Sequence, residues 1–308
     1  MPATLRFYLV DAFAEQPFRG NMAGVVFDAD TLSAAQMQRI AGEIHASETA
    51  FLSRANDLHR PMRIRWFTPT TEVGFCGHAT LASAHALHEA GCLAGLLSRP
   101  DASLVLDSAA GELRLRPEML PEPYVGPMWW LDMPDPALKA DHTNPIRTCE
   151  LLGLSIDDLD PALPAMRSRD DDVIYIVRRW QTLMDLRPDF AELARWCERN
   201  HIRGLCVATT ATLAASVNVH SRFFAPAVGI NEDPVTGSVH GPLAVYLVVN
   251  GLVGRAGGRS ALLCAQGRPG DRSGLVRALV ESTPQGYRVR IAGQCFTTLT
   301  GELRVPPE

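Results

Sequence analysis

The sequence lacks several features that would assign a protein class directly. Its seven cysteines are scattered, odd in number and never spaced as Cys-x-x-Cys, which argues against a disulfide framework and a zinc ribbon. Charged residues make up only 20% of the chain and the net charge is −5, so nothing indicates nucleic-acid binding. The longest apolar stretches, such as Gly241–Leu252, are far shorter than a membrane span.

The N-terminal residues also lack a targeting pattern. They enter a strand-like sequence directly, without a charged segment followed by an apolar one. We therefore expect a cytoplasmic protein that has neither membranes nor nucleic acids as partners. With 308 residues, of which 46% are hydrophobic, the chain is long enough for two domains that each have a core.

What the chain does contain is one unusual segment in two copies. The first copy runs through Arg65-Trp-Phe67-Thr-Pro69, Glu72, Cys76-Gly77-His78 and an apolar run to Gly91; the second runs through Arg222-Phe-Phe224-Ala-Pro226, Glu232, Thr236-Gly237-Ser238 and an apolar run to Gly251. From the glutamate onward the two copies are offset by a constant 160 residues. Such a repeat predicts two related half-domains, with a reaction site where they meet.

Hydrophobic periodicity predicts a chain that mixes helices and strands. Helices are expected from a capping box at Ser33–Gln36 to about His45, and over His78–Glu89, Pro145–Leu152, Pro188–Asn200 and Ser238–Asn250. Strands are expected at Leu5–Phe13, Gly24–Phe27, Thr49–Arg54, Met62–Phe67, Leu104–Asp107, Glu112–Arg116, Asp172–Val177, Gly204–Thr209, Leu275–Glu281, Gly286–Ile291 and Gln294–Glu302, and Val217–Phe224 leads into the second copy of the segment. The region around Arg167–Asp172 is interpreted as an exposed loop.

A proline-rich stretch from Pro117 to Pro136 interrupts the pattern. We place the domain boundary near its start, because boundaries favour such segments. This gives an N-terminal half-domain over residues 1–118 and a C-terminal half-domain over residues 119–295. A C-terminal strand within 296–308 is expected to return to the first half-domain, and the active site is expected in the cleft between the two.

Each copy of the repeat places a glycine and a polar residue at a helix start. The unpaired amides of a first helical turn, together with the positive end of the helix dipole, favour a bound carboxylate. Gly77-His78 and Gly237-Ser238 are therefore candidate anion-binding pairs. The alternative, that each pair is only a tight turn before a helix, is the better interpretation of either copy alone, and the repetition favours function.

Cys76 and Thr236 occupy the same position in the two copies. Two matched cysteines would suit a racemase that removes a proton on one face and returns it on the other. Threonine is a poor acid or base, which argues against a two-thiol mechanism. Cys76 is equally well explained as a small buried side chain.

The other titratable candidates are weak when each is taken singly. His78, His85 and His88 share one predicted helix, but their spacing does not suit metal ligands, so no metal is expected. Of the three, His78 is retained as a polar site residue. Glu48 follows Ser47 between a helix and a strand, where apolar neighbours would raise its pKa. Asp233 precedes a proline that fixes the local backbone, although it could be a simple turn residue.

Taken together, several motifs resemble one known family. They are Gly20-Asn21-Met22-Ala-Gly-Val-Val26, Ser47-Glu48-Thr49-Ala-Phe51, Phe67-Thr-Pro69-Thr-Thr-Glu72-Val-Gly-Phe-Cys76-Gly77-His78-Ala-Thr80 and Glu232-Asp233-Pro234-Val-Thr236-Gly237-Ser238-Val-His240. In this order they resemble the phenazine-biosynthesis-like (PhzF-like) isomerases of the diaminopimelate-epimerase fold. The resemblance implies an α+β fold of two pseudo-repeated half-domains, each a mostly antiparallel, barrel-like sheet around a central helix.

The resemblance also implies roles for individual residues. Glu48 would be the proton shuttle, assisted by His78 and Asp233. Substrate binding would fall to residues of the two helix starts, namely Gly77, Gly237, Ser238, Thr236 and Cys76. No cofactor is expected, the partner is a small carboxylate substrate, and the expected assembly is a homodimer. Met22 stands where many members have proline, which bears on turn geometry and not on chemistry.

Two rival functions remain open at this stage. The first is an amino-acid racemase or epimerase, or a dehydratase of a proline derivative, that uses Cys76 as its base with Thr236 opposite. The second is a small-molecule binding protein without catalytic activity. The sequence predicts the type of reaction and leaves the substrate open.

Overall fold

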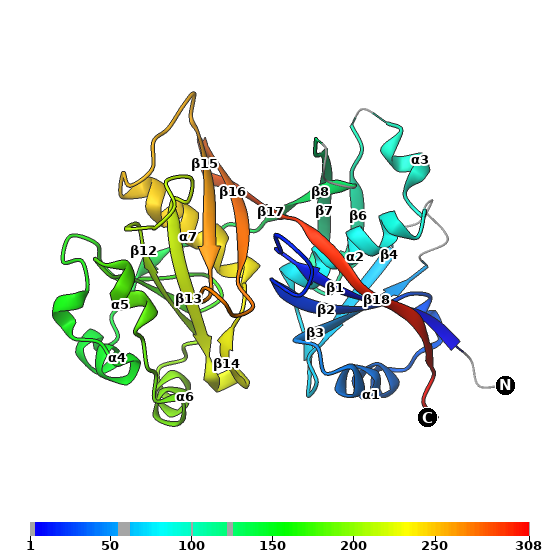
Figure 1. Cartoon of the computed structure of the whole chain (residues 1–308), viewed down its shortest axis with the longest axis horizontal. Coiled ribbons are helices and arrows are strands. Elements are labelled where there is room, and N and C mark those ends of the chain that lie inside the picture. The colour runs from blue at the N-terminus through cyan, green and yellow to red at the C-terminus, as the bar shows by residue number, and fades with distance from the viewer. Residues whose placement is uncertain (1–3, 55–61, 100, 122–125, 308) are drawn as a thin grey trace. The chain divides into compact units, whose positions relative to one another are not determined.

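The computed structural model describes residues 4–54, 62–99, 101–121 and 126–307, and the chain divides into two compact units (Figure 1). The first unit consists of Met1–Asp132 and Ala292–Glu308, and the second is Met133–Ile291. The first segment of the first unit ends at Asp132, near the end of β8 (Pro127–Met133), which pairs antiparallel with β7 (Gly111–Met119). The apolar run Met128-Trp-Trp-Leu131 makes this strand despite the surrounding prolines.

The first unit is built on a mixed, mostly antiparallel sheet. Its other strands are β1 (Thr4–Ala12), β2 (Asn21–Val26), β3 (Glu48–Ser53), β4 (Met62–Phe67), β5 (Glu72–Val73), β6 (Leu104–Ser108) and β18 (Cys295–Arg304). β18 lies along the whole of β1, with Thr4 opposite Arg304 and Ala12 opposite Cys295. β2 and β3 run parallel, as do β4 and β6, whereas the pairs β1–β2, β3–β4, β4–β5 and β6–β7 are antiparallel.

Helix α2 (Gly77–Glu89) is the centre of the first unit and packs against β1, β2, β3 and β18. Every residue from Gly77 to Leu87 is buried, because Ala, Leu, Ser and Thr surround the helix on all sides. The hydroxyls of Thr80 and Ser83 donate to carbonyls one turn earlier, so these buried polar groups are satisfied. Helix α1 (Ala34–Ile44) is amphipathic and begins with the expected capping box at Ser33. A short helix, α3 (Ala94–Leu97), follows α2.

The second unit repeats this order of strand pairings. Its strands are β9 (Lys139–Ala140), β10 (Met166–Arg167), β11 (Asp172–Ile176), β12 (Gly204–Thr209), β13 (Val219–Ala225), β14 (Ile230–Asp233), β15 (Arg259–Gln266), β16 (Gly274–Thr283) and β17 (Gly286–Gly293). The pairs β11–β12 and β13–β15 are parallel, and β12–β13, β13–β14 and β15–β16 are antiparallel. The same series occurs in the first unit from β2 to β7.

Helix α7 (Gly237–Val249) takes the place in the second unit that α2 takes in the first. It is apolar on all sides, buried from Val239 to Val248, and contacts β15 and β16. The smaller helices α4 (Pro145–Leu152), α5 (Trp180–Met184) and α6 (Phe190–Arg199) cover a separate core that includes Leu151, Leu193 and Phe224. Single turns of 3₁₀ helix lie at Ala29–Thr31, Ile156–Asp158 and Pro226–Val228.

The structure confirms the expected mixture of helices and mostly antiparallel strands. Each predicted helix is present within a few residues of its expected bounds. Sequence periodicity missed β8 and β15, because one lies among prolines and the other follows a glycine-rich turn. Among the described residues, no helix is long and apolar enough to cross a membrane.

Candidate active site

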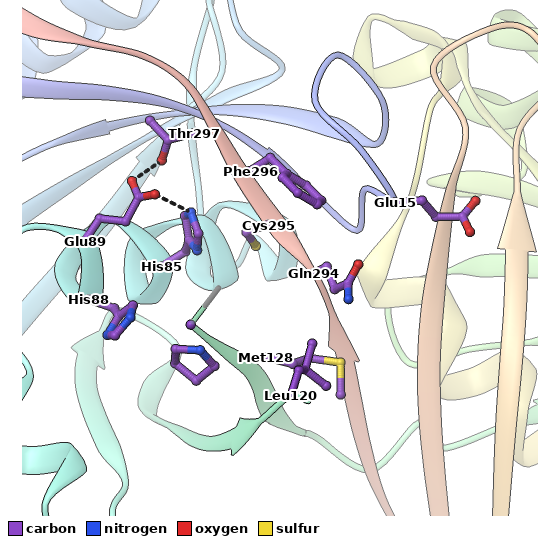
Figure 2. A pocket seen from close by; sticks show the side chains of 12 residues that line it. Glu15, His85, His88, Glu89, Leu120, Met128, Gln294, Cys295, Phe296 and Thr297 are labelled. Atoms are coloured by element: carbon purple, nitrogen blue, oxygen red, sulfur yellow. Dashed lines mark hydrogen bonds and ion pairs between the residues drawn. The ribbon is translucent and has the colours of Figure 1, made fainter. Parts of the chain in front are cut away.

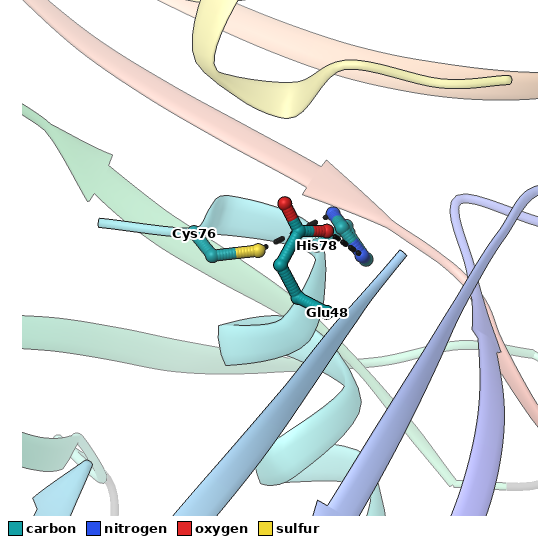
Figure 3. A group of neighbouring side chains, drawn as sticks. All are labelled: Glu48, Cys76 and His78. Carbon is teal, nitrogen blue, oxygen red and sulfur yellow. Dashed lines mark hydrogen bonds and ion pairs between the residues drawn. The ribbon is translucent and has the colours of Figure 1, made fainter. Parts of the chain in front are cut away.

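The start of α2 brings together three titratable side chains from distant parts of the sequence (Figure 3). Glu48 is the first residue of β3, Cys76 precedes the first residue of α2, and His78 is its second residue. Nε2 of His78 lies 3.2 Å from Oε2 of Glu48, and Nδ1 lies 3.4 Å from Sγ of Cys76. One potential ligand atom from each residue lies within 4.8 Å of the other two. The structure thus places two of the three predicted catalytic residues in contact.

Burial determines the charge of His78. The residue is 6% exposed, and desolvation lowers the pKa of its imidazole to about 3. The ring is therefore neutral at neutral pH. Its contact with Glu48 is close but lacks hydrogen-bond geometry. The imidazole of His78 carries no positive charge and binds a further proton only at low pH. Glu48 is therefore the group of this pair that is suited to gain and lose a proton.

Two further residues fix the orientation of the His78 ring. Nδ2 of Asn21 lies 3.5 Å from Nδ1 of His78, and Oδ1 of Asn21 accepts a hydrogen bond of 2.9 Å from Oγ of Ser47. This arrangement gives Nδ1 the acceptor role and leaves the ring proton on Nε2, facing Glu48. Sequence reasoning treated Asn21 only as part of a turn and a family motif, so its contact with His78 was missed.

Gly20 makes this arrangement sterically attainable. Its φ is +67°, and a Cβ placed there would lie 2.2 Å from the carbonyl oxygen of Ala12. Only glycine fits this close approach of two backbone segments. The turn allows β2 to begin at Asn21, beside β1. The parallel register of β2 with β3, in which Ala23 lies opposite Glu48, then sets Asn21 near this glutamate.

The start of α7 carries a hydrogen-bonded cluster of a different kind. Thr236 precedes the helix, and its Oγ1 donates to the carboxylate of Asp233, the last residue of β14. The side-chain amide of Gln266 closes the loop, since its Oε1 accepts from the Thr236 amide at 2.9 Å and its Nε2 donates to the Asp233 carbonyl at 2.8 Å. All three residues are buried. Gln266 ends β15, a strand that the sequence pattern did not reveal, so its role was also missed.

Ser238 is held by an arginine that sequence reasoning did not single out. Nη2 of Arg203 donates to Oγ of Ser238 at 3.1 Å and to the carboxylate of Asp172. Asp172 is completely buried, and burial raises its pKa to about 7 against the opposing effect of Arg203. The expectation that Arg167–Asp172 forms an exposed loop holds for Arg169 and Asp170 and is wrong for the residues on either side of them. Ser168 and Asp172 are buried, and Arg167 pairs with Asp141 at 3.0 Å.

Both helix starts leave the first-turn amides without a side-chain cap. Cys76 and Thr236 occupy the N-cap positions of α2 and α7, and neither side chain accepts a capping hydrogen bond. Gly77 and Gly237 are the first helical residues, as the sequence predicts. Such amides, at the positive end of a helix, are suited to bind an anion.

The same arginine–glutamate clamp precedes both helix starts. Arg65 binds Glu72 through two hydrogen bonds of 2.7 and 2.8 Å. Arg222 binds Glu232 through two of 2.7 Å each. Each guanidinium also stacks on a phenylalanine two residues later, Phe67 in one unit and Phe224 in the other, about 5 Å from the ring centre. The repeated sequence therefore produces a repeated local structure.

The three histidines of α2 do not converge. His85 and His88 lie one helical turn apart near the far end of α2, where they line a separate cavity of about 460 Å³ (Figure 2). There Nε2 of His85 lies 3.3 Å from Oε1 of Glu89, and Oε2 of the same carboxylate accepts from the hydroxyl of Thr297. Of the three, only His78 belongs to the cluster with Glu48 and Cys76.

Comparison with known proteins assigns the family. The model of the phenazine biosynthesis-like proteins matches residues 10–301. The chain belongs to this family. A family relative from Escherichia coli K12, named an uncharacterized isomerase (YddE), is 36% identical over 291 residues and is matched over 93% of this chain and 94% of its own. The family match and the isomerase name of this relative together identify the phenazine biosynthesis-like protein as an enzyme of the isomerase type.

Solved structures agree with the family assignment. A PhzF-family phenazine biosynthesis protein from Bacillus anthracis superposes with a TM-score of 0.85 at 27% identity, covering 98% of this chain and 99% of that one. A hydroxyproline epimerase from Agrobacterium vitis superposes with a TM-score of 0.59 at 12% identity, covering 99% and 94%. The second likeness is one of fold alone, and it shows that the fold is shared with epimerases.

Proposed function

We propose that this phenazine biosynthesis-like protein is a cofactor-independent isomerase that relocates a proton on a small carboxylate-bearing metabolite, with Glu48 as the general acid and base. The observation that carries the proposal is the contact between the Glu48 carboxylate and the neutral, buried ring of His78. A carboxylate beside a neutral imidazole in a largely water-free position can accept a proton and return it.

The reaction follows from this pair. Glu48 removes a proton from a carbon next to an electron-withdrawing group, and the bonding electrons move into the neighbouring conjugated system. The protonated glutamate, whose acidic proton exchanges with solvent, then delivers a proton to another carbon of that system. His78 remains neutral throughout and orients the carboxyl group from its Nε2 side. No redox partner is needed, because substrate and product are isomers.

The starts of α2 and α7 are proposed to bind the substrate carboxylate. Uncapped amides follow Cys76 and Thr236, and Arg203 adds a positive charge beside Ser238. Asp233, fixed by Thr236, is proposed to orient the substrate. The repeated pairing order around α2 and α7 supports two pseudo-repeated, barrel-like half-domains, each with a helix start suited to an anion.

A second candidate function is an epimerase that uses Cys76 as its base. The supporting observation is the 3.4 Å approach of Cys76 Sγ to His78 Nδ1, since a neutral imidazole can accept a thiol proton. The position equivalent to Cys76 in the second unit is Thr236, whose hydroxyl is bound to Asp233. A single thiol with no matching acid fits two-base epimerisation poorly, so the Glu48 mechanism is preferred.

A metabolite screen in deuterated water tests the proposal. The purified enzyme is incubated with candidate carboxylates, and products are analysed by mass spectrometry and NMR for deuterium at a carbon next to a carboxylate or enamine. We expect label in an isomer of one substrate class, and no label with Glu48→Gln. Ligand binding without any exchange, across substrates that bind, would instead support a non-catalytic binding protein.

A further inference from the structure

The cluster at the start of α2 combines three kinds of metal ligand. Cys76 supplies sulfur, His78 supplies imidazole nitrogen, and Glu48 supplies carboxylate oxygen, all within 4.8 Å. Sequence reasoning excluded a metal because it considered only the histidines along α2. The structure draws the relevant set from β3 and from the residues around the start of α2.

The separation of sulfur and nitrogen fits one metal geometry well. In a tetrahedral zinc site, sulfur at about 2.3 Å and nitrogen at about 2.0 Å from the ion lie about 3.5 Å apart. Sγ of Cys76 and Nδ1 of His78 are 3.4 Å apart. The Glu48 carboxylate contacts the other nitrogen of the same ring, Nε2, at 3.2 Å, so its side chain must rotate to become the third ligand.

Charge and softness point to the same class of ion. A thiolate and a carboxylate together neutralise a divalent cation, so the occupied site carries no net charge into a buried position. Thiolate and imidazole ligands favour Zn²⁺ over Mg²⁺ or Ca²⁺, which prefer oxygen. Asn21 approaches Nδ1 at only 3.5 Å, so a metal on that nitrogen displaces a weak contact.

We propose that Glu48, Cys76 and His78 bind Zn²⁺ or a similar thiophilic divalent cation through three ligands, and that occupation inhibits the enzyme reversibly. The predicted inhibition rests on the proposed function, since the metal would occupy the carboxylate of Glu48. The predicted metal binding does not depend on the proposed function. The second unit provides an internal contrast, because Thr236 and Ser238 stand at the equivalent positions and offer no soft ligand.

Cobalt substitution tests the site without any substrate. Co²⁺ is titrated into the metal-free protein while absorption is recorded, because thiolate coordination produces a charge-transfer band in the near ultraviolet and tetrahedral geometry produces intense visible bands. We expect one equivalent to bind with both features, and Zn²⁺ to displace it. Absence of a saturable thiolate band in the wild-type protein would overturn the proposal.

Matched variants identify the ligands. Cys76→Ser is expected to abolish the thiolate band and weaken binding by at least about 100-fold. Cys92→Ser changes a partly buried cysteine beyond the far end of α2. It should leave both the thiolate band and the metal affinity unchanged. Glu48→Gln should weaken binding by about 10-fold or more while keeping the thiolate band. A band that persists in Cys76→Ser refutes the site, and the Glu48→Gln titration still decides it if Cys76→Ser fails to fold.

The inhibition is measured separately. Once the deuterium screen has found a substrate, Zn²⁺ should stop proton exchange in the wild-type enzyme, and a chelator should restore it. Full exchange with the metal bound would refute the inhibitory role. If no exchange is found with any substrate, the proposed function fails, whereas the cobalt spectra still decide whether the metal site exists.

Discussion

The starts of α2 and α7 share a backbone design and differ in chemistry. Each follows an Arg–Glu clamp, each begins with glycine, and each lacks a side-chain cap. At α2 the side chains are an imidazole, a thiol and a carboxylate in contact. At the start of α7 the side chains are the hydroxyl of Thr236, the amide of Gln266 and the carboxylate of Asp233, joined by hydrogen bonds. Similar backbone at the two helix starts thus carries titratable side chains in one unit and a hydrogen-bonded polar cluster in the other.

The largest expected effect separates these two roles. Glu48→Gln keeps the shape of the side chain but removes its ability to accept a proton. We expect the rate to fall by about 10²–10⁴ with substrate binding retained. Steady-state kinetics and a binding titration on the same variant measure the two quantities. Turnover near the wild-type rate would remove Glu48 from the mechanism.

The two clamps should differ sharply in their contribution to stability. Arg222 is 1% exposed and also donates to the carbonyls of Leu183 and Leu186, whereas Arg65 is 31% exposed. Arg222→Ala leaves Glu232 and buried carbonyls unpaired, so we expect a loss of about 3–5 kcal/mol. Arg65→Ala should cost no more than about 1 kcal/mol. Urea unfolding of both variants measures the difference, and equal losses would show that the clamps are equivalent.

Each central helix buries a neutral histidine, and this makes stability depend on pH. Burial lowers the pKa of His78 to about 3 and that of His240 to about 4, from an ordinary value near 6.5. Below pH 6.5 these two histidines bind protons in the unfolded chain but stay unprotonated in the folded chain. The free energy of unfolding should therefore fall as the pH drops from 6.5 toward 4, by at most about 1.4 kcal/mol per pH unit for each histidine.

A single variant isolates one of these contributions. Nδ1 of His240 lies 2.7 Å from the Thr236 carbonyl, and His240→Gln can keep a donor there while removing the titration. Urea unfolding between pH 4 and 7 should show a shallower dependence for the variant than for the wild type. An unchanged slope would mean that His240 takes up its proton equally in both states.

The smallest expected effect concerns Cys76. Cys76→Ser should keep at least about a tenth of the activity, a loss below about 1.4 kcal/mol of transition-state stabilisation. A thiol base would instead lose several orders of magnitude, because a serine hydroxyl does not ionise near neutral pH. Parallel kinetics of Cys76→Ser and Glu48→Gln decide between the two mechanisms. An inactive Cys76→Ser with an active Glu48→Gln would establish the thiol mechanism.

Sequence patterns predicted the central helices and most strands, because their signals are local. The Ala- and Leu-rich run after Gly77 needs no partner to be recognised as a buried helix. The contacts of the site are not local. Asn21, Glu48 and His78 meet only because β2 and β3 are parallel and α2 packs across them. Only the family motifs drew attention to Glu48, since a lone glutamate before a strand has no distinctive pattern.

The residues missed around α7 have the same explanation. Arg203 comes directly before β12, Asp172 begins β11, and Ser238 lies in α7, so their contact depends on the tertiary fold. A charged run such as Arg169–Asp172 looks solvated in sequence. Burial of Asp172 becomes evident only when the parallel pairing of β11 with β12 is known.

The pairing of β1 with β18 has a consequence for biosynthesis. The second unit is one continuous segment, Met133–Ile291, and can fold as soon as it has been synthesised. The sheet of the first unit stays open until Cys295–Arg304 has been made, and Gln36 and Arg39 of α1 must then bind the carbonyls of Pro306 and Pro307. The segment translated first is therefore completed last, and until then β1 presents an unpaired edge on which chaperones or neighbouring chains can act.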